Sequence, residues 1–374
     1  MRASLLLEDG TVFYGQGLGI ETDIVGEIVF NTAMSGYEEV ISDPSYLGQI
    51  VLFTTSYIGN TGITREDLES HKMFAEGMIC KNVSLIPDNF RSKLSLDSYL
   101  KEQNKCAIYD LDTRLIAQKI RDKGCMSAIL STKDHNIDSL TKKLNASSKL
   151  SQTNVVEIYQ RQSDTKSKLL KTNTNQLNKL KVAIFDFGMK QGILDSLLEL
   201  NCDPVFFSPN STIEEIEAIQ PDGIFFSNGP GDPTILAKET NILSVMQKLL
   251  PKYPCFGICL GHQLIGLSYG AAIEKLKFGH HAINHPVKAL FSNSSQVLIT
   301  SQNHNYIVNI NNCNDIFEVT HIHLNDGTLA GMKHKTLPIY SVQFHPESNP
   351  GPRDALAIFD DFIKSMQLKK KLAE

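Results

Sequence analysis

The chain has 374 residues, 41% of them hydrophobic and 21% charged, and a formal net charge of −5. This length predicts two domains, and the composition is that of a soluble globular protein. It contains no basic block typical of nucleic-acid binding and no apolar run long enough for a membrane-spanning helix. Seven cysteines without a CxxC pair, and acidic residues that interrupt the first apolar run, predict a cytoplasmic protein.

The chain is predicted to have three parts. Residues 1–150 are rich in short β-branched runs bounded by glycines, which predicts a β-rich N-terminal domain. Helical spacing is found at 95–102 and 113–123. Residues 151–179 are rich in Ser, Thr, Asn, Gln and Lys and predict a polar linker, with a short strand expected at 155–159.

Residues 180–374 show a regular alternation of apolar strands and helical stretches. This alternation predicts an α/β domain with a mostly parallel central sheet and helices on both faces. Later segments such as 296–300 alternate apolar and polar residues, which favours antiparallel additions at the sheet edge. The expected strands are 181–186, 204–207, 223–226 and 255–258, and the expected helices include 212–219, 234–250 and 261–269.

A Gly-x-Cys-x-Gly element centred on Cys259 falls where the fourth strand should turn into a helix. It is similar to a nucleophile elbow, in which flanking glycines permit a tight turn that holds the nucleophile above the sheet. A helix N-terminus favours the reactive thiolate, and the N–H of Leu260 would be available to an oxyanion. The alternative is a small buried cysteine in a glycine-rich turn.

His345 and Glu347 supply a base and its orienting carboxylate. Strand residues two apart face the same side, so a strand that ends here can present both side chains together. Glu347 would then orient the imidazole, while His345 acts as the base for the thiol of Cys259. The alternative is a surface His-Pro-Glu turn.

The segment 227–233, Ser-Asn-Gly-Pro-Gly-Asp-Pro, directly follows the third expected strand. Its glycines and prolines favour a rigid loop whose N–H groups can approach a ligand closely. It lacks the lysine and the serine or threonine of a Walker phosphate loop. We therefore expect an oxyanion or substrate cradle, with an ordinary turn as the alternative.

Together these three elements resemble the class I, triad-type glutamine amidotransferase family, over about residues 181–365. The resemblance implies that Cys259 attacks the side-chain amide of glutamine, which gives a thioester and releases ammonia, and that water then yields glutamate. It also implies that the oxyanion donors are the backbone N–H groups of Leu260 and Gly229. Gln263 matches a position that contacts the substrate.

The N-terminal half, notably 30–39, 43–51 and 58–62, resembles the opening domain of carbamoyl-phosphate synthetase small subunits. This implies a large ATP-grasp partner subunit, contacted by the N-terminal domain, that makes carbamoyl phosphate from bicarbonate and ATP for arginine and pyrimidine biosynthesis. ATP and a divalent metal are expected on that partner, and no cofactor in this chain. The glutamine contacts implied by the resemblance are Ser45, Gly229, Gly231, Leu260, Gln263, Asn303, Asn305 and Tyr306.

The sequence also departs from the family pattern. Asn305 replaces a usual glycine, and Ala282-Ile283 replaces a glycine-rich stretch. Asn tolerates a left-handed backbone best among ordinary residues, so we expect the Asn305 change to be harmless. Three histidines, His280, His281 and His285, lie close together in the sequence. They lack cysteine or carboxylate partners at metal-site spacing, so no metal is expected.

Two other functions fit parts of this pattern. The chain could be the glutaminase subunit of another synthetase or a stand-alone γ-glutamyl hydrolase, but the N-terminal domain argues against both. A non-catalytic scaffold subunit would usually have lost the nucleophile or the base, whereas Cys259, His345 and Glu347 are all present. Co-purification with a large ATP-dependent subunit would separate these functions.

Overall fold

The fold is described from a computed structural model, which covers residues 1–163, 179–290 and 296–373. It divides into two compact units. Unit 1 comprises Met1–Thr153 and Lys277–Ala282, and unit 2 comprises Asn154–Leu276 and Ile283–Glu374. Unit 1 ends its first segment close to the predicted boundary at residue 150, whereas residues 164–178 of the predicted linker lie outside the described residues.

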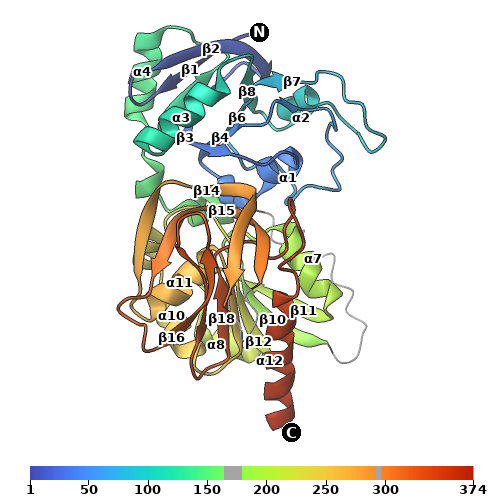
Figure 1. The fold of residues 1–374 in the computed structure, drawn as a ribbon, viewed down its shortest axis with the longest axis vertical. Helices are drawn as coiled ribbons and strands as arrows, with labels where there is room; N and C mark the ends of the chain where they lie inside the picture. The colour runs from blue at the N-terminus through green and yellow to red at the C-terminus, as the bar shows by residue number, and fades with distance from the viewer. Residues whose placement is uncertain (164–178, 291–295, 374) are drawn as a thin grey trace. The chain divides into compact units, whose positions relative to one another are not determined.

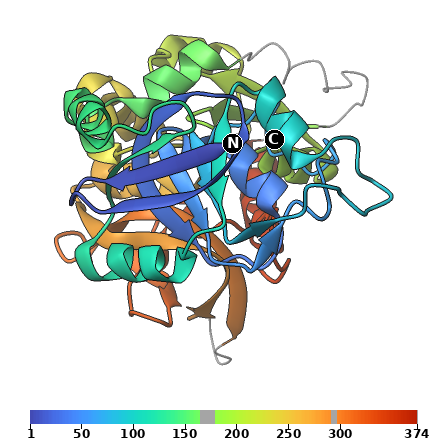
Figure 2. The same ribbon diagram turned by 90° about the horizontal axis from the view of Figure 1, so that it is seen from above.

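Unit 1 is built on a closed barrel with the strand order β1-β2-β8-β6-β4-β3-β9 (Figure 1). Figure 2 shows these strands from above, with the first of them in dark blue. Leu5, Ile28 and Ile108 are fully buried in one core cluster, together with the apolar stripe of α3. The barrel strands are β1 Arg2–Leu7, β2 Val12–Gly19, β3 Asp23–Asn31, β4 Gln49–Phe53, β6 Gly77–Ile79, β8 Cys106–Tyr109 and β9 Met126–Ser131.

The two helices predicted for this domain are confirmed as α2 (Leu96–Glu102) and α3 (Thr113–Lys123). Each begins at a side-chain cap, since Ser95 and Asp112 accept hydrogen bonds from backbone N–H groups three residues later. The remaining elements of unit 1 are α1 Tyr37–Ser42, the 3-10 helices η1 Pro44–Tyr46 and η2 Leu150–Gln152, β5 Tyr57–Ile58, β7 Asn82–Val83 and α4 Ile137–Ala146.

Unit 2 contains a nine-stranded sheet in the order β11-β10-β12-β13-β18-β17-β16-β14-β15. Neighbours from β11 to β18 pair in parallel, whereas β17 is antiparallel to β18 and β16 to β17. The predicted mostly parallel sheet with antiparallel additions is therefore confirmed. Its strands are β10 Leu180–Phe185, β11 Cys202–Phe207, β12 Gly223–Phe226, β13 Cys255–Ile258, β14 Ala272–Ala289, β15 Val297–Asn309, β16 Phe317–His323, β17 Leu329–His334 and β18 Ile339–Val342.

Helices cover this sheet with two separate apolar clusters. Leu249, Leu264 and Ile265 belong to one cluster, and Ile193 and Phe359 to the other, and all five side chains are fully buried. None of the helices in the described ranges combines the length and the apolar character that crossing a bilayer requires. The helices of unit 2 are α5 Val155–Gln162, α7 Gln191–Glu199, α8 Ile213–Ala218, α9 Pro233–Glu239, α10 Ile242–Leu249, α11 Leu260–Ser268 and α12 Ile358–Ala373.

Two predictions about local structure were wrong. Residues 155–159 lie in helix α5 rather than in a strand, because Asn154 caps the helix and Val156 and Tyr159 pack into unit 2. Here tertiary packing overrides the β-propensity of valine. The helix expected at 234–250 is broken into α9 and α10, since Thr240 is extended at the end of α9.

Candidate active site

Four segments that carry predicted site residues or Lys190 follow neighbouring parallel strands of unit 2. Lys190 follows β10, Gly229 follows β12, Cys259 follows β13, and His345 follows β18. Because these strands are parallel and lie beside one another, their carboxyl ends share one edge of the sheet. Binding sites of open α/β sheets form at this edge. The fold therefore brings the catalytic residues predicted for this domain to one place.

Cys259 occupies the turn between β13 and α11 with a backbone conformation that few non-glycine residues adopt. Its φ is 52° and its ψ is −102°, and it is the N-cap of α11. Its N–H donates to the carbonyl oxygen of Val342 over 2.9 Å, and its own carbonyl oxygen accepts from the N–H of Gln263. Such strained conformations cost roughly 1–3 kcal/mol and cluster at active sites. The turn has the geometry expected of a nucleophile elbow.

The glycines on either side of Cys259 are required by close packing. A Cβ on Gly261 would lie 2.1 Å from the carbonyl oxygen of Phe226, and one on Gly257 would lie 2.7 Å from Cδ1 of Ile265. The N–H of Gly261 also donates to the carbonyl oxygen of Ser227 over 3.0 Å. The Gly-x-Cys-x-Gly spacing thus lets the first turn of α11 approach the end of β12.

Two backbone N–H groups predicted to act on the oxyanion have no acceptor among the described residues. Among residues 1–163, 179–290 and 296–373, no hydrogen bond is made by the N–H of Leu260 or of Gly229. Leu260 begins α11, where the helix leaves its first N–H groups without intrahelical partners. These are the two oxyanion donors that the family resemblance implies, and both are available for that role.

His345 and Glu347 form a buried pair that Lys190 completes. Nδ1 of His345 lies 2.7 Å from Oε1 of Glu347, and Nζ of Lys190 lies 3.0 Å from the same oxygen. Lys190 also donates to the carbonyl oxygen of Ser348 over 2.6 Å. Burial opposes ionisation of the Glu347 carboxyl, but Lys190 and His345 outweigh it, so the pKa of Glu347 falls from 4.5 to about 2. The glutamate is therefore anionic at neutral pH.

Lys190 was missed by the sequence analysis. A lysine just after a strand is usually a solvated surface residue, whereas only 3% of this side chain is exposed. The one available signal was its position, because it follows a strand of the parallel sheet at the edge where site residues gather.

Strand β15 lies against both the nucleophile and the base. The N–H of His345 donates to the carbonyl oxygen of Ser301 over 2.9 Å, and Sγ of Cys259 lies 3.5 Å from the carbonyl oxygen of Asn303. Residues two apart on a strand are separated by about 7 Å. Nε2 of His345 is buried without a hydrogen-bond partner among the described residues, so it is not bonded to the thiol here. Catalytic hydrogen bonds often tighten only when substrate binds.

Most of the predicted glutamine-binding residues lie on the segments around Cys259. Nε2 of Gln263 donates to the carbonyl oxygen of Tyr306 over 2.8 Å, which joins α11 to β15. Asn303 and Asn305 lie on the same strand and are buried. Gly231 lies with Gly229 in the loop after β12. A role for these residues in binding glutamine stays a prediction.

Ser45 is the one predicted contact that lies in unit 1. It belongs to the 3-10 helix η1, where its N–H donates to Oδ1 of the capping Asp43 over 2.9 Å. This is the ordinary turn chemistry that the sequence allowed for this segment. Contact between Ser45 and glutamine stays a prediction.

Asn305 does not have the left-handed backbone on which the expectation of a harmless change was based. Asn305 lies within β15, and it is not one of the non-glycine residues with a positive φ. Tolerance of a left-handed backbone therefore has no bearing on this substitution. Ala282 and Ile283 likewise lie inside strand β14, so this departure from the family pattern forms part of a regular strand.

Two histidines of unit 2 could offer nitrogen atoms to a metal. Nε2 of His323 lies 3.0 Å from Nδ1 of His285, and Nδ1 of His323 lies 3.1 Å from Oδ1 of Asp326. Burial lowers the pKa of His323, although Asp326 opposes this. The lowered pKa of His323 favours its neutral form, which can share a hydrogen bond with His285, and the absence of a metal stays a prediction.

The sheet, the cysteine at its strand-to-helix turn and the His-Glu pair define an α/β domain of the glutamine amidotransferase class. In agreement, residues 183–365 match the family Glutamine amidotransferase class-I. Residues 5–130 match a second family, Carbamoyl-phosphate synthase small chain, CPSase domain.

Similar curated proteins cover nearly the whole chain. The carbamoyl phosphate synthase pyrimidine-specific small chain of Bacillus subtilis is 42% identical over 100% of this chain and 98% of its own length. The carbamoyl phosphate synthase small chain of Clostridium perfringens is 44% identical over 97% of this chain and 99% of its own. The small chain of Aquifex aeolicus is 42% identical over 98% and 99%. The chain therefore belongs to the carbamoyl phosphate synthase small chain family.

Proposed function

We propose that this chain hydrolyses glutamine to glutamate and ammonia through Cys259 and supplies the ammonia to a large synthetase subunit. The observation that carries this proposal is the position of Cys259. It lies at a strained strand-to-helix turn, beside the strand whose continuation holds the buried His345–Glu347 pair. Membership in the small chain family supports glutamine as the substrate.

In the first half-reaction, the thiol of Cys259 gives its proton to Nε2 of His345 and the sulfur attacks the amide carbon of glutamine. The carbonyl oxygen becomes an oxyanion, which the N–H groups of Leu260 and Gly229 stabilise. When this intermediate collapses, the C–N bond breaks and the proton on His345 passes to the leaving nitrogen. The products are ammonia and a γ-glutamyl thioester.

In the second half-reaction, water replaces ammonia at the same carbon. His345 takes a proton from the water as its oxygen attacks the thioester, and the C–S bond then breaks. The sulfur recovers the proton from His345, and glutamate leaves. Glu347, anionic with a pKa of about 2, stabilises the imidazolium that forms in both halves.

The partner in this proposal is the large ATP-grasp subunit of carbamoyl-phosphate synthetase. It would combine the ammonia with bicarbonate and ATP, and both ATP and a divalent metal would bind there. Direct transfer is chemically sensible because free ammonia would protonate to unreactive ammonium. The relatives share this chain's full length, which favours the role over a different synthetase or a stand-alone hydrolase. Cys259, His345 and Glu347 are all present and buried, which argues against a non-catalytic scaffold.

The test is the variant Cys259→Ser in the complete complex. Glutamine-dependent carbamoyl phosphate synthesis should fall to background, while synthesis from added ammonium chloride should be retained. Glutamate release should be followed with and without the large subunit, because a partner can set the active geometry. Unchanged glutamate release by the variant would overturn the mechanism.

A further inference from the structure

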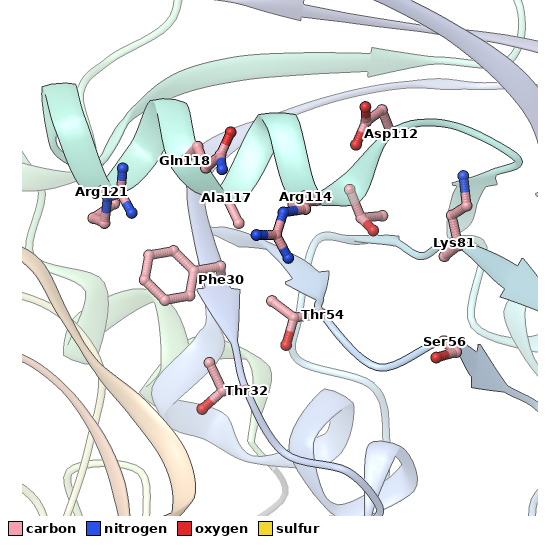
Figure 3. Close-up of a pocket in the computed structure, with 11 residues that line it drawn as sticks. Phe30, Thr32, Thr54, Ser56, Lys81, Asp112, Arg114, Ala117, Gln118 and Arg121 are labelled. Carbon is pink, nitrogen blue, oxygen red and sulfur yellow. The ribbon is translucent and has the colours of Figure 1, made fainter.

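Unit 1 has an open cavity of about 660 Å³ along one face of α3 (Figure 3). Arg114 and Arg121 line it from this helix, and residues seven apart share a helical face. Lys81 lines it from the segment after β6, and the hydroxyl groups of Thr54 and Ser56 line it from the segment after β4. The cavity therefore combines three cations with neutral hydrogen-bonding groups.

Two of the three cations of this cavity have no ion-pair partner among the described residues. Among residues 1–163, 179–290 and 296–373, the side chains of Lys81 and Arg114 make no hydrogen bond or ion pair. Arg121 pairs with the adjacent Asp122 over 2.8 Å at the surface. The lining contains one carboxylate, Asp112, which caps α3 by accepting from the N–H of Leu115. An acidic ligand would thus complement the cavity, although the whole chain carries a net charge of −5.

A loop that carries exposed apolar side chains, residues 84–94, begins beside this cavity. The side chain of Asn82 donates to the carbonyl oxygen of Ser56 over 3.0 Å, so the strand that leads into the loop is bonded to a lining residue. In the loop, Ile86 is 82% exposed and Phe90 is 95% exposed. In both views the loop after β7 extends away from the other elements of unit 1 (Figure 1, Figure 2).

Hydrogen bonds and an ion pair hold this loop in place. The N–H of Asp88 donates to the carbonyl oxygen of Asn60 over 2.9 Å, and Oγ of Ser84 donates to the carbonyl oxygen of Ile86 over 2.8 Å. Arg91 pairs with Asp67. The loop is thus fixed while its large apolar side chains face solvent. Single exposed apolar residues are common on protein surfaces, but large exposed apolar side chains gathered on one segment are typical of a surface that another molecule covers.

We propose that the cavity and the loop form a docking surface for an acidic and partly apolar segment of the large synthetase subunit. The proposal rests on the proposed function for the existence of that partner. Arginine and aromatic side chains are enriched among the residues that dominate the binding energy of protein interfaces, and the cavity and the loop supply one kind each. It also lies within residues 5–130, the part of the chain that matches the small chain family rather than the amidotransferase family.

The test compares the affinity of full-length variants for the purified large subunit, by isothermal titration calorimetry. The variants are the double substitution Ile86→Asp with Phe90→Asp, and the single substitution Arg114→Glu. Each should raise the Kd about 30-fold or more, as expected when central interface residues are lost. Melting temperature and glutamate release by the free chain should not change.

Matched controls lie outside this surface. Leu372→Asp changes an apolar residue that is 80% exposed on α12, and Lys142→Glu reverses an exposed charge on α4. Both should leave the Kd within about twofold of the wild-type value.

Three results would contradict the proposal. An unchanged Kd for either test variant would overturn the docking surface while leaving the proposed function intact. Self-association of the wild-type chain in sedimentation experiments, abolished by the same variants, would assign the surface to a second copy instead. A wild-type chain that does not bind the large subunit at all would overturn the proposed partner, and this surface with it.

Discussion

One surface of unit 1 and one buried cluster of unit 2 depart from ordinary packing in opposite ways. Unit 2 buries the charged side chains of Lys190 and Glu347 almost completely, beside a buried histidine. Unit 1 exposes Ile86 and Phe90 and leaves Arg114 without an ion pair among the described residues. Burying charge is costly unless the groups are paired, and exposing large apolar groups forgoes their burial. We infer that the departure from ordinary packing at Lys190 and Glu347 serves chemistry and that the one at Ile86 and Phe90 serves contact.

The largest expected effect in unit 2 is on catalysis. His345→Gln removes the base, so glutamate release should fall about 10³-fold, within the range for general base catalysis. Ammonia-dependent synthesis by the complex should stay within about twofold of the wild type. His334→Gln, on β17, is the matched control and should retain glutaminase activity. Activity of the His345 variant within tenfold of the wild type would exclude it as the base.

Removing the Lys190 cation from its buried ion pair with Glu347 should mainly affect stability. Lys190→Met leaves the Glu347 carboxylate buried without its ammonium partner, so the free energy of unfolding should fall by about 3–5 kcal/mol. Urea denaturation of the purified chain measures this loss. Lys101→Met is the control, because that lysine forms an exposed ion pair with Asp97 and should cost less than about 1 kcal/mol. Equal losses for the two variants would show that burial of the pair has no energetic consequence.

The turn around the nucleophile should not accept an added methyl group. In Gly261→Ala the new Cβ would meet the carbonyl oxygen of Phe226, so α11 must shift, at a cost of about 3 kcal/mol. Gly270→Ala is a useful comparison, since no atom lies within 4 Å of its Cβ position, although its φ of 90° makes some strain unavoidable. Urea unfolding and glutamate release should both be more impaired in the Gly261 variant.

His262 should make stability depend on pH. Burial, with nearby His321, lowers the pKa of His262 from 6.5 to about 3. The folded state therefore resists protonation, so this contribution to stability is full above pH 6.5 and is lost as pH falls toward 3. As the pH falls from 6.5 toward 3, the free energy of unfolding should fall more steeply in the wild type than in His262→Phe. The two slopes should differ by roughly 1 kcal/mol per pH unit. Parallel pH profiles would contradict the burial of a neutral imidazole.

The smallest effect is expected on the exposed side of unit 1. Phe90→Ser should change the free energy of unfolding by less than about 0.5 kcal/mol, because the side chain is already in solvent. Glutamate release by the isolated chain should also be unchanged. A stability loss as large as that of Lys190→Met would show that Phe90 packs within unit 1 and would remove the contrast between the units.

Local patterns predicted unit 2 better than unit 1. The parallel strands and the turn at Cys259 follow from short apolar runs and from glycine spacing, both of which are local signals. The barrel of unit 1 depends on long-range pairing, such as β6 lying between β4 and β8, which no local pattern specifies. Lys190 became recognisable only when folding brought it to Glu347, 157 residues further along the chain.

The proposed function depends on attack of the Cys259 sulfur on the side-chain carbonyl carbon of glutamine. A glutamine analogue with a chloromethyl ketone in place of the amide would alkylate that sulfur, and peptide mass spectrometry would locate the adduct. We predict one label per chain on Cys259, protection by glutamine, and loss of glutamine-dependent but not ammonia-dependent synthesis. Inactivation with the label on another residue, and with Cys259 unmodified, would contradict the account.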